Sequence, residues 1–229
     1  MKILKPNVYH QDFFNQQEVG TMKILVVGAT GMVGSQIVKE LSERGHETTL
    51  ASRSGGEGVL KLDASDVQQL TAAAIGHDVV VFAVSPPRDG SDTIEPTMKL
   101  GHAMIAASHQ ANVQRLMVVG GAGSLLLPDG SRLCDAATFP PEYKAEAIAH
   151  LMLLEKLRTE ATEINWTYIS PAAAFSPGER TGKFVVGGDS FMTNAAGESY
   201  ISVEDFAIML VNELEHQSVS KQRLSVVGV

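Results

Sequence analysis

The chain has 229 residues, of which 44% are hydrophobic and 19% charged, so it can fill the core of one sizeable domain and is not intrinsically disordered. Its net charge of −8 repels phosphate backbones, and we expect no nucleic-acid partner. Cys134 is the only cysteine, which excludes an internal disulfide and fits the cytoplasm, and no apolar run is long enough to predict a membrane span.

Residues 1–21 precede the first predicted element. The segment is polar and lacks the apolar centre of a signal peptide. The tetrapeptide Met-Lys-Ile-Leu occurs at Met1 and again at Met22. We therefore expect the fold to begin at Met22 and interpret residues 1–21 as an extension of unknown role, for which an artefact or an upstream start is as good an explanation as a biological function.

Strands and helices alternate in the first half of the chain. The apolar segment Lys23–Val27 ends at Gly28 and is typical of a strand buried on both faces. Gly31–Arg44 has apolar residues at helical spacing and ends before Gly45. The next predicted elements are strands over His46–Ala51 and Val59–Leu62, a helix over Ser65–Ile75 with Ser65 as N-cap, and a strand over Asp78–Val84.

The alternation continues in the second half. The predicted elements are a helix over Glu95–Ala111, a strand over Arg115–Val119, a helix over Tyr143–Thr159, a strand over Asn165–Ile169, a helix from Ser202 and a strand over Leu224–Val227. Residues 172–200 are rich in turn formers and are predicted to be a long surface segment with a short strand at Lys183–Val186. This order implies one doubly wound α/β domain over residues 22–229, a parallel sheet of the Rossmann type with helices on both faces.

The glycine-rich turn from Gly28 to Gly34 follows a predicted strand and opens a helix, which is the context of a dinucleotide site. Gly28 permits the tight turn, Gly31 lets the backbone approach a pyrophosphate, and Gly34 lets the helix pack on the strand. The first-turn N–H groups and the helix dipole favour an anion. A turn that merely contains three glycines is the alternative, and the order and position favour the dinucleotide. The predicted contacts also include Thr30, Met32 and Val33.

The end of the second strand indicates which dinucleotide is bound. NAD sites usually place an acid there, whereas this chain has Ser52, Arg53 and Ser54. A guanidinium with two neighbouring hydroxyls favours a 2′-phosphate, so NADP(H) is preferred over NAD(H), with an ordinary solvated Arg53 as the alternative. Asp63 follows the third strand and is either a hydrogen-bond acceptor for the adenine amino group or a turn residue.

These features resemble the short-chain dehydrogenase/reductase superfamily in its atypical branch, in particular NADH-flavin reductases and NAD(P)-binding proteins related to NmrA and biliverdin reductase B. The resemblance runs from about Met22 to the C-terminus and is carried by the glycine turn, by Val118-Val-Gly-Gly-Ala-Gly-Ser124-Leu and by Tyr200-Ile-Ser-Val-Glu-Asp205-Phe-Ala. It implies cofactor contacts from three further segments, namely Ala83, Val84 and Ser85 at the ribose and pyrophosphate, Gly120 and Gly121 in the second motif, and Ser170, Pro171 and Ala172 near the nicotinamide.

One departure from the family pattern concerns proton transfer. Typical members use Tyr-x-x-x-Lys, but Tyr143 is followed four residues later by Ala147, and Lys144 is adjacent to it. Neighbours on a helix point about 100° apart, so Lys144 cannot play the usual part. Hydride transfer to a conjugated acceptor demands less of the protein. We take Ser124 and Tyr143 as candidate catalytic residues, with loop capping and helix packing as their respective alternatives.

The sequence therefore predicts a cytoplasmic NAD(P)H-dependent oxidoreductase that transfers hydride from NADPH to a small planar acceptor, of which free flavin is the leading candidate. Its substrate site is expected from residues 85–92, 124–142 and 172–200. A non-catalytic NADP(H) sensor of the NmrA type and an epimerase- or dehydratase-like enzyme are the alternatives. The seven histidines show no metal-binding spacing, so no metal is expected, and the protein is expected to be a monomer or homodimer.

Overall fold

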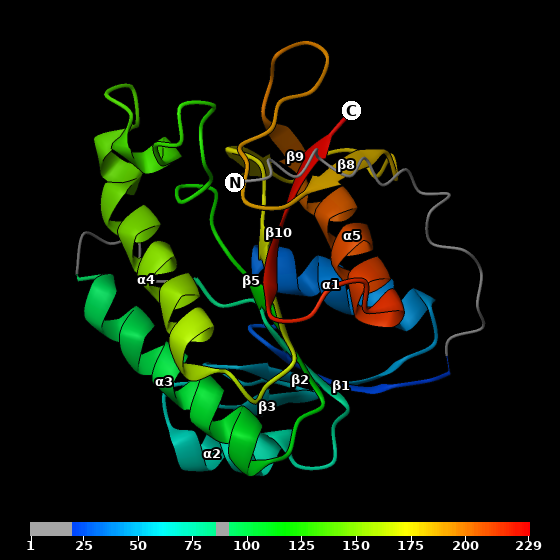
Figure 1. Ribbon diagram of the computed structural model, residues 1–229. Coiled ribbons are helices and arrows are strands. Elements are labelled where there is room, and N and C mark those ends of the chain that lie inside the picture. Colours follow the sequence, from blue (N-terminus) through cyan, green and yellow to red (C-terminus); the bar gives the residue numbers. More distant parts are fainter. Residues whose placement is uncertain (1–19, 86–91) are drawn as a thin grey trace.

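A twisted sheet of eight strands forms the centre of the molecule (Figure 1). The computed structural model describes residues 20–85 and 92–229. The strand order is β3-β2-β1-β4-β5-β6-β10-β8, and every neighbouring pair is parallel except β10 with β8. The strands are β1 (Lys23–Val27), β2 (Glu47–Ser52), β3 (Val59–Lys61), β4 (Val79–Phe82), β5 (Arg115–Val119), β6 (Trp166–Ser170), β8 (Phe184–Gly187) and β10 (Gln222–Gly228).

Helices cover both faces of this sheet. The helices are α1 (Met32–Glu43), α2 (Val67–Ala74), α3 (Ile94–Gln110), α4 (Lys144–Glu160) and α5 (Val203–His216). α1 packs with α5 on one face, and α2, α3 and α4 pack side by side on the other (Figure 1). In β1, Ile24 and Val26 join the core under α1 and α5, whereas Leu25 and Val27 join the core under α2, α3 and α4. This double burial is why the strand is an uninterrupted apolar run rather than an alternating one.

The predicted α/β class and the order of the main elements are confirmed. The chain leaves β1 toward β2 and β3 on one side, and then returns to place β4 on the other side of β1. The strand order therefore reverses between β1 and β4, and ligands of open α/β sheets bind in the crevice beyond the carboxyl ends of such strands. Gly28 follows the last residue of β1 and lies at that crevice.

The helices begin within two residues of their predicted starts, and two of the differences have a clear structural cause. The N-cap of α2 is Asp66 and not Ser65, because the Asp66 carboxylate accepts hydrogen bonds from the Gln68 and Gln69 amides. The Ser65 hydroxyl donates to Asp63 instead. α4 begins one residue later than predicted, since Tyr143 ends a short 3₁₀ turn, η3 (Pro141–Tyr143). A second such turn, η2 (Leu133–Asp135), lies in the preceding loop.

Residues 172–200 are more ordered than the sequence suggests. β7 (Ala174–Ser176) and β9 (Tyr200–Ser202) form a separate parallel pair, and β8 extends the main sheet as an antiparallel edge. The Asp205 carboxylate in the first turn of α5 accepts hydrogen bonds from the amides of Thr181 and Gly182. The sequence therefore predicted β8 in this segment but not the strands β7 and β9. Of the predicted substrate segment 85–92, residues 86–91 lie outside the described residues, as do residues 1–19 of the extension.

No helix within residues 20–85 and 92–229 has the length and apolar character needed to span a bilayer.

Candidate dinucleotide-binding site

The turn between β1 and α1 contains three glycines, and the backbone geometry requires two of them. Gly28 has φ +88°, and a Cβ on it would lie 2.4 Å from the carbonyl oxygen of Ala83 at the end of β4. A Cβ on Gly34 would lie 2.1 Å from the carbonyl oxygen of Gly28. Both glycines are therefore required by the fold itself, because no side chain fits between these backbones.

Gly31 differs from these two glycines. It is exposed, its φ of −75° suits any residue, and a Cβ would meet only the Gly28 carbonyl oxygen, at 3.3 Å. That contact is slightly tight but does not exclude a side chain. The fold thus gives little reason for glycine at position 31, whereas a ligand that approaches the backbone closely would give one.

The amino end of α1 is open to an anion. No side chain caps it among the described residues, since its N-cap is Gly31. Side chains satisfy three other helix starts: Asp66 accepts from the first turn of α2, Asp92 from the Ile94 and Glu95 amides of α3, and Ser202 from α5. Within the described part of the chain, the start of α4 has no side-chain cap either, but it follows the 3₁₀ turn η3 directly, without a break. Unpaired first-turn amides and the helix dipole together suit a pyrophosphate, so this terminus fits a dinucleotide. The predicted contacts Thr30, Met32 and Val33 lie at this terminus, and the first two are exposed.

The turn after β2 presents an unpaired guanidinium. Ser52 is buried, and its hydroxyl accepts a hydrogen bond from the Gly55 amide at 3.1 Å and lies 3.4 Å from the Ser54 hydroxyl. Arg53 and Ser54 are exposed, and Arg53 has no hydrogen-bond or ion-pair partner within the described part of the chain. β2 neighbours β1 in the sheet, so this turn and the glycine turn follow adjacent parallel strands. A free guanidinium in this position is available to a 2′-phosphate.

Asp63 takes part in a local turn. One of its carboxylate oxygens accepts hydrogen bonds from the amide and the hydroxyl of Ser65, at 2.9 and 2.8 Å. These bonds, the amide's first, hold the pKa of Asp63 below its ordinary value. The structure thus gives Asp63 a structural role, while contact with adenine stays a prediction.

The carboxyl ends of β4 and β6 provide the next predicted contacts. The Ala83 amide donates to the Val27 carbonyl at 2.9 Å, which places Ala83, Val84 and Ser85 directly after the strand beside β1. Ser170 ends β6 fully buried, and its hydroxyl has no hydrogen-bond partner among the described residues. Such an unpaired hydroxyl costs about 1–3 kcal/mol, so a hydrogen bond from a bound ligand would stabilise it. Pro171 and Ala172 follow it and are also buried.

Gly120 and Gly121 have a packing explanation that the sequence did not reveal. A Cβ on Gly120 would lie 2.1 Å from the ring of Tyr168, and the Gly121 amide donates to the Tyr168 hydroxyl at 3.1 Å. That hydroxyl donates in turn to the His150 carbonyl at 3.2 Å, and burial raises the pKa of Tyr168. The Tyr168 ring therefore accounts for Gly120, and the His150 ring, 3.1 Å from a Cβ on Gly121, leaves little space for a side chain there. Contact of the two glycines with a cofactor stays a prediction.

The two candidate catalytic residues differ in their surroundings. Ser124 is only 4% exposed, and its hydroxyl accepts a hydrogen bond from the Arg223 guanidinium at 2.8 Å. Tyr143 is 52% exposed. Lys144 donates to the Cys134 carbonyl and to the Asp135 carboxylate, and is therefore engaged away from the Tyr143 side chain. Arg223 is not among the residues predicted from the sequence, because no local pattern links it to a serine 99 positions earlier.

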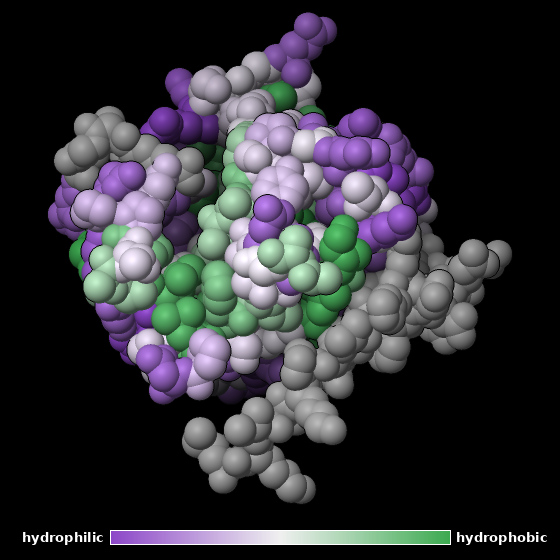
Figure 2. All heavy atoms as spheres, turned by 90° about the horizontal axis from the view of Figure 1, so that it is seen from above, coloured by the Kyte–Doolittle hydropathy of each residue, from purple (hydrophilic) through white to green (hydrophobic). Residues whose placement is uncertain are grey.

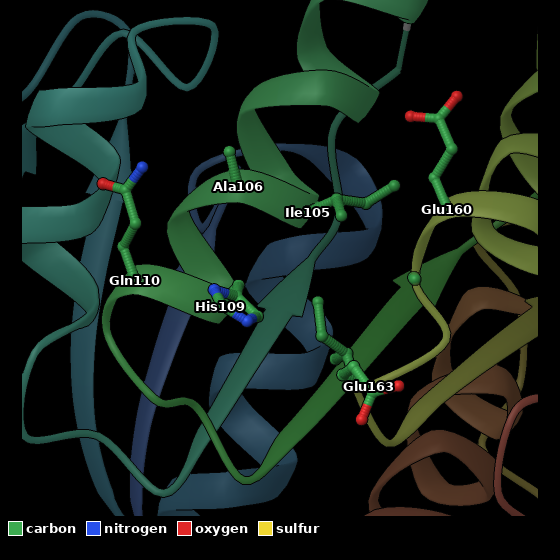
Figure 3. A pocket seen from close by; sticks show the side chains of 8 residues that line it. Ile105, Ala106, His109, Gln110, Glu160 and Glu163 are labelled. Atoms are coloured by element: carbon green, nitrogen blue, oxygen red, sulfur yellow. The ribbon is translucent and has the colours of Figure 1, made fainter.

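Hollows elsewhere on the surface suit a dinucleotide less well. One of them, of about 400 Å³, lies between the carboxyl ends of α3 and α4, with Glu160 and Glu163 on one side and His109 on the other (Figure 3). These ends precede β5 and β6 directly, so the hollow lies at the opposite edge of the sheet from the glycine turn. Two carboxylates and two helix carboxyl ends make it electronegative, which opposes a phosphate.

The face toward which β10 points is mixed in character. Seen from above, hydrophobic and weakly polar side chains gather in the middle of this face, and hydrophilic side chains gather at its margins (Figure 2). Such a surface suits a ligand with an apolar body and a polar edge.

Comparison with known proteins agrees with the geometry of the glycine turn. A family model described as NAD(P)H-binding matches residues 28–217. The "Uncharacterized protein YwnB" of Bacillus subtilis (strain 168) is 40% identical over 216 residues, 90% of this chain and 99% of that protein. Among solved structures, "SP1627, a putative NADH-flavin reductase, from Streptococcus pneumoniae TIGR4" has a TM-score of 0.79 at 36% identity, over 91% of this chain and 100% of that one. A "putative epimerase" from Bacteroides thetaiotaomicron has a TM-score of 0.83 at 33% identity, over 92% and 98%. The chain therefore belongs to the NAD(P)H-binding Rossmann family, a group akin to the atypical short-chain dehydrogenases/reductases.

Proposed function

We propose that the protein is an NADPH-dependent reductase that transfers hydride to a small planar acceptor, with free flavin as the leading candidate. The observation that carries this proposal is the uncapped amino end of α1 at the switch point of the sheet, next to a turn that carries the unpaired Arg53. The first feature would hold the pyrophosphate, and the second would select the 2′-phosphate. The name of the Streptococcus pneumoniae relative points to the same acceptor.

The residues near the expected nicotinamide favour reduction of a conjugated acceptor. The bound nucleotide supplies the hydride, so the protein has only to fix the geometry of donor and acceptor. Ser170 and the buried residues after it would shape the nicotinamide side of the site. The hydroxyl of Ser124, oriented by Arg223, would donate a hydrogen bond to the acceptor, and the proton that completes the reduction would come from water.

A non-catalytic NADP(H) sensor is the second candidate. It is favoured by the engagement of Lys144 with Cys134 and Asp135, which leaves Tyr143 without the lysine that activates such tyrosines in related enzymes. The same arrangement disfavours an epimerase, because epimerase chemistry depends on that acid–base pair, although the Bacteroides relative bears the name of one.

One assay separates these functions. Purified protein is mixed with NADPH and, in turn, riboflavin, FMN, FAD and simple quinones, and the absorbance of the reduced nicotinamide is followed. We expect turnover with at least one flavin. Tight NADPH binding without turnover of any acceptor would support the sensor, and conversion of a nucleotide sugar without net oxidation of the cofactor would support the epimerase.

A further inference from the structure

A second hollow, of about 150 Å³, lies between α4 and the beginning of β10. Three guanidinium groups, of Arg132, Arg158 and Arg223, contribute to its lining, together with the Ser124 hydroxyl and the carboxylates of Glu155 and Asp189. Binding sites for drug-sized ligands are commonly about 300–1,000 Å³, so this hollow suits a small group rather than a ring system or a dinucleotide. It shares no residue with the glycine turn or with the turn that carries Arg53.

Arg223 is the fixed cation of this hollow. Its side chain is 3% exposed, and it forms an ion pair with the Asp189 carboxylate at 2.6 Å while donating to Ser124. Burial lowers the pKa of Arg223, which reflects the cost of keeping a charge away from water. Because a buried charge needs a compensating one, an anion must remain beside this guanidinium.

The other two guanidiniums are more accessible. Arg158 donates to the same Asp189 oxygen at 2.8 Å and to Glu155 at 2.9 Å. The nearest carboxylate to Arg132 belongs to Asp135, at 4.0 Å, which is too far for a hydrogen bond. Arg132 therefore keeps donors that the described residues do not use.

The charges of the lining do not balance. Three guanidiniums face two carboxylates, so the lining carries one net positive charge on a chain whose net charge is −8. A single Asp189 oxygen also serves both Arg158 and Arg223. Planar guanidiniums with unused donors recognise phosphates and carboxylates in particular, because their paired N–H groups match two oxygens.

We propose that this hollow is a binding site for an oxyanion, either a phosphate or a carboxylate group, held by Arg132 and Arg158 beside the fixed Arg223. Two sources share this chemistry: a free anion, or an anionic group carried by the acceptor itself. Since Ser124 belongs to both the hollow and the candidate acceptor site, an acceptor that reached from one to the other would place its anionic group here.

The first experiment measures binding of inorganic phosphate by titration calorimetry at constant ionic strength. The protein is saturated with its dinucleotide, so that the amino end of α1 is not available to phosphate. We expect saturable binding that Arg132→Gln and Arg158→Gln each weaken about tenfold or more, the loss expected for one charge-assisted hydrogen bond. The control Lys99→Gln removes one exposed positive charge from α3 and should leave the affinity within about twofold.

A variant that removes a negative charge should have the opposite effect on phosphate affinity. Asp189→Asn removes the carboxylate that neutralises Arg158 and Arg223, so phosphate should bind about tenfold more tightly and should raise the melting temperature more than in the wild type. If Asp189→Asn does not fold, the two arginine variants still decide. The absence of saturable phosphate binding to the wild-type protein, or equal affinities in Arg158→Gln and Lys99→Gln, would overturn the proposal.

Comparison of kcat/KM for acceptors with and without a phosphate group identifies the source of the anion. This experiment rests on the proposed function. If the acceptor carries it, Arg158→Gln should lower kcat/KM for FMN about tenfold and leave kcat/KM for riboflavin unchanged. If the anion is free, Arg158→Gln should leave kcat/KM for both FMN and riboflavin unchanged, while its affinity for inorganic phosphate falls. Both results support the site and identify its ligand. Should no acceptor turn over, the proposed function fails, and the phosphate titration still decides about the hollow.

Discussion

Replacement of Arg53 tests the selection of NADPH directly. The Arg53 side chain is exposed and has no partner within the described residues, so Arg53→Ala removes no interaction of the folded protein. Surface changes of this kind alter stability by about 0.5 kcal/mol or less. A hydrogen bond to a charged group contributes about 1.5–3 kcal/mol. Its loss should therefore raise the dissociation constant of NADPH roughly 10- to 150-fold. NADH lacks the 2′-phosphate and should bind with nearly unchanged affinity.

The assay is calorimetric titration of NADPH and NADH into the wild type, Arg53→Ala and the control Lys39→Ala, which removes an exposed positive charge from α1. Arg53→Lys keeps the charge but loses the planar pair of donors, and should fall between the wild type and Arg53→Ala. Equal losses for the two nucleotides in Arg53→Ala would refute the reasoning, since they would show that Arg53 acts on a part that both nucleotides share.

Three further predictions concern the turn and the buried charges. Gly31→Val should keep its melting temperature within a few degrees and lose NADPH affinity at least about tenfold, whereas Gly34→Ala should lower the melting temperature strongly; unchanged NADPH affinity in Gly31→Val would contradict a close approach of the ligand. Glu213→Gln removes the buried partner of Arg115 and should lower the free energy of unfolding, measured in urea, by about 3–5 kcal/mol. Burial raises the pKa of Glu40, but hydrogen bonds from Arg180 and Arg44 more than offset this, so the pKa lies below its ordinary value of 4.5. The stabilisation from Glu40 is therefore complete above the unfolded pKa and disappears as the pH falls through the lowered one, and Glu40→Gln should flatten this acid limb of stability.

The main elements could be predicted because their signals are local. The apolar run of β1 lies between two helix layers, so every residue from Ile24 to Val27 is buried, and such a run is visible without knowledge of the partners. The glycine turn is local in the same sense, since Gly28 and Gly34 contact each other within seven residues.

The features that escaped prediction depend on contacts between distant residues. β7 pairs with β9 although β8 lies between them in the sequence, and Asp205 in α5 accepts hydrogen bonds from the Thr181 and Gly182 amides. The hydrogen bond between Arg223 and Ser124 joins positions 99 residues apart. The sequence does not predict such partners, because it does not show whether a carboxylate or guanidinium is solvated or forms a hydrogen bond within the protein.

Comparison of the glycines separates what the fold requires from what a ligand would require. Gly28, Gly34 and Gly120 each lack room for a Cβ because another part of the same chain fills the space, so these three would be glycines in a protein of this shape that bound nothing. Gly31 has an ordinary backbone conformation and one marginal contact. The glycine motif as a whole is thus weak evidence of function, since most of it is explained by packing. A bound dinucleotide is supported instead by Gly31, by the uncapped amides beside it and by the unpaired Arg53, three features that the described part of the fold does not otherwise need.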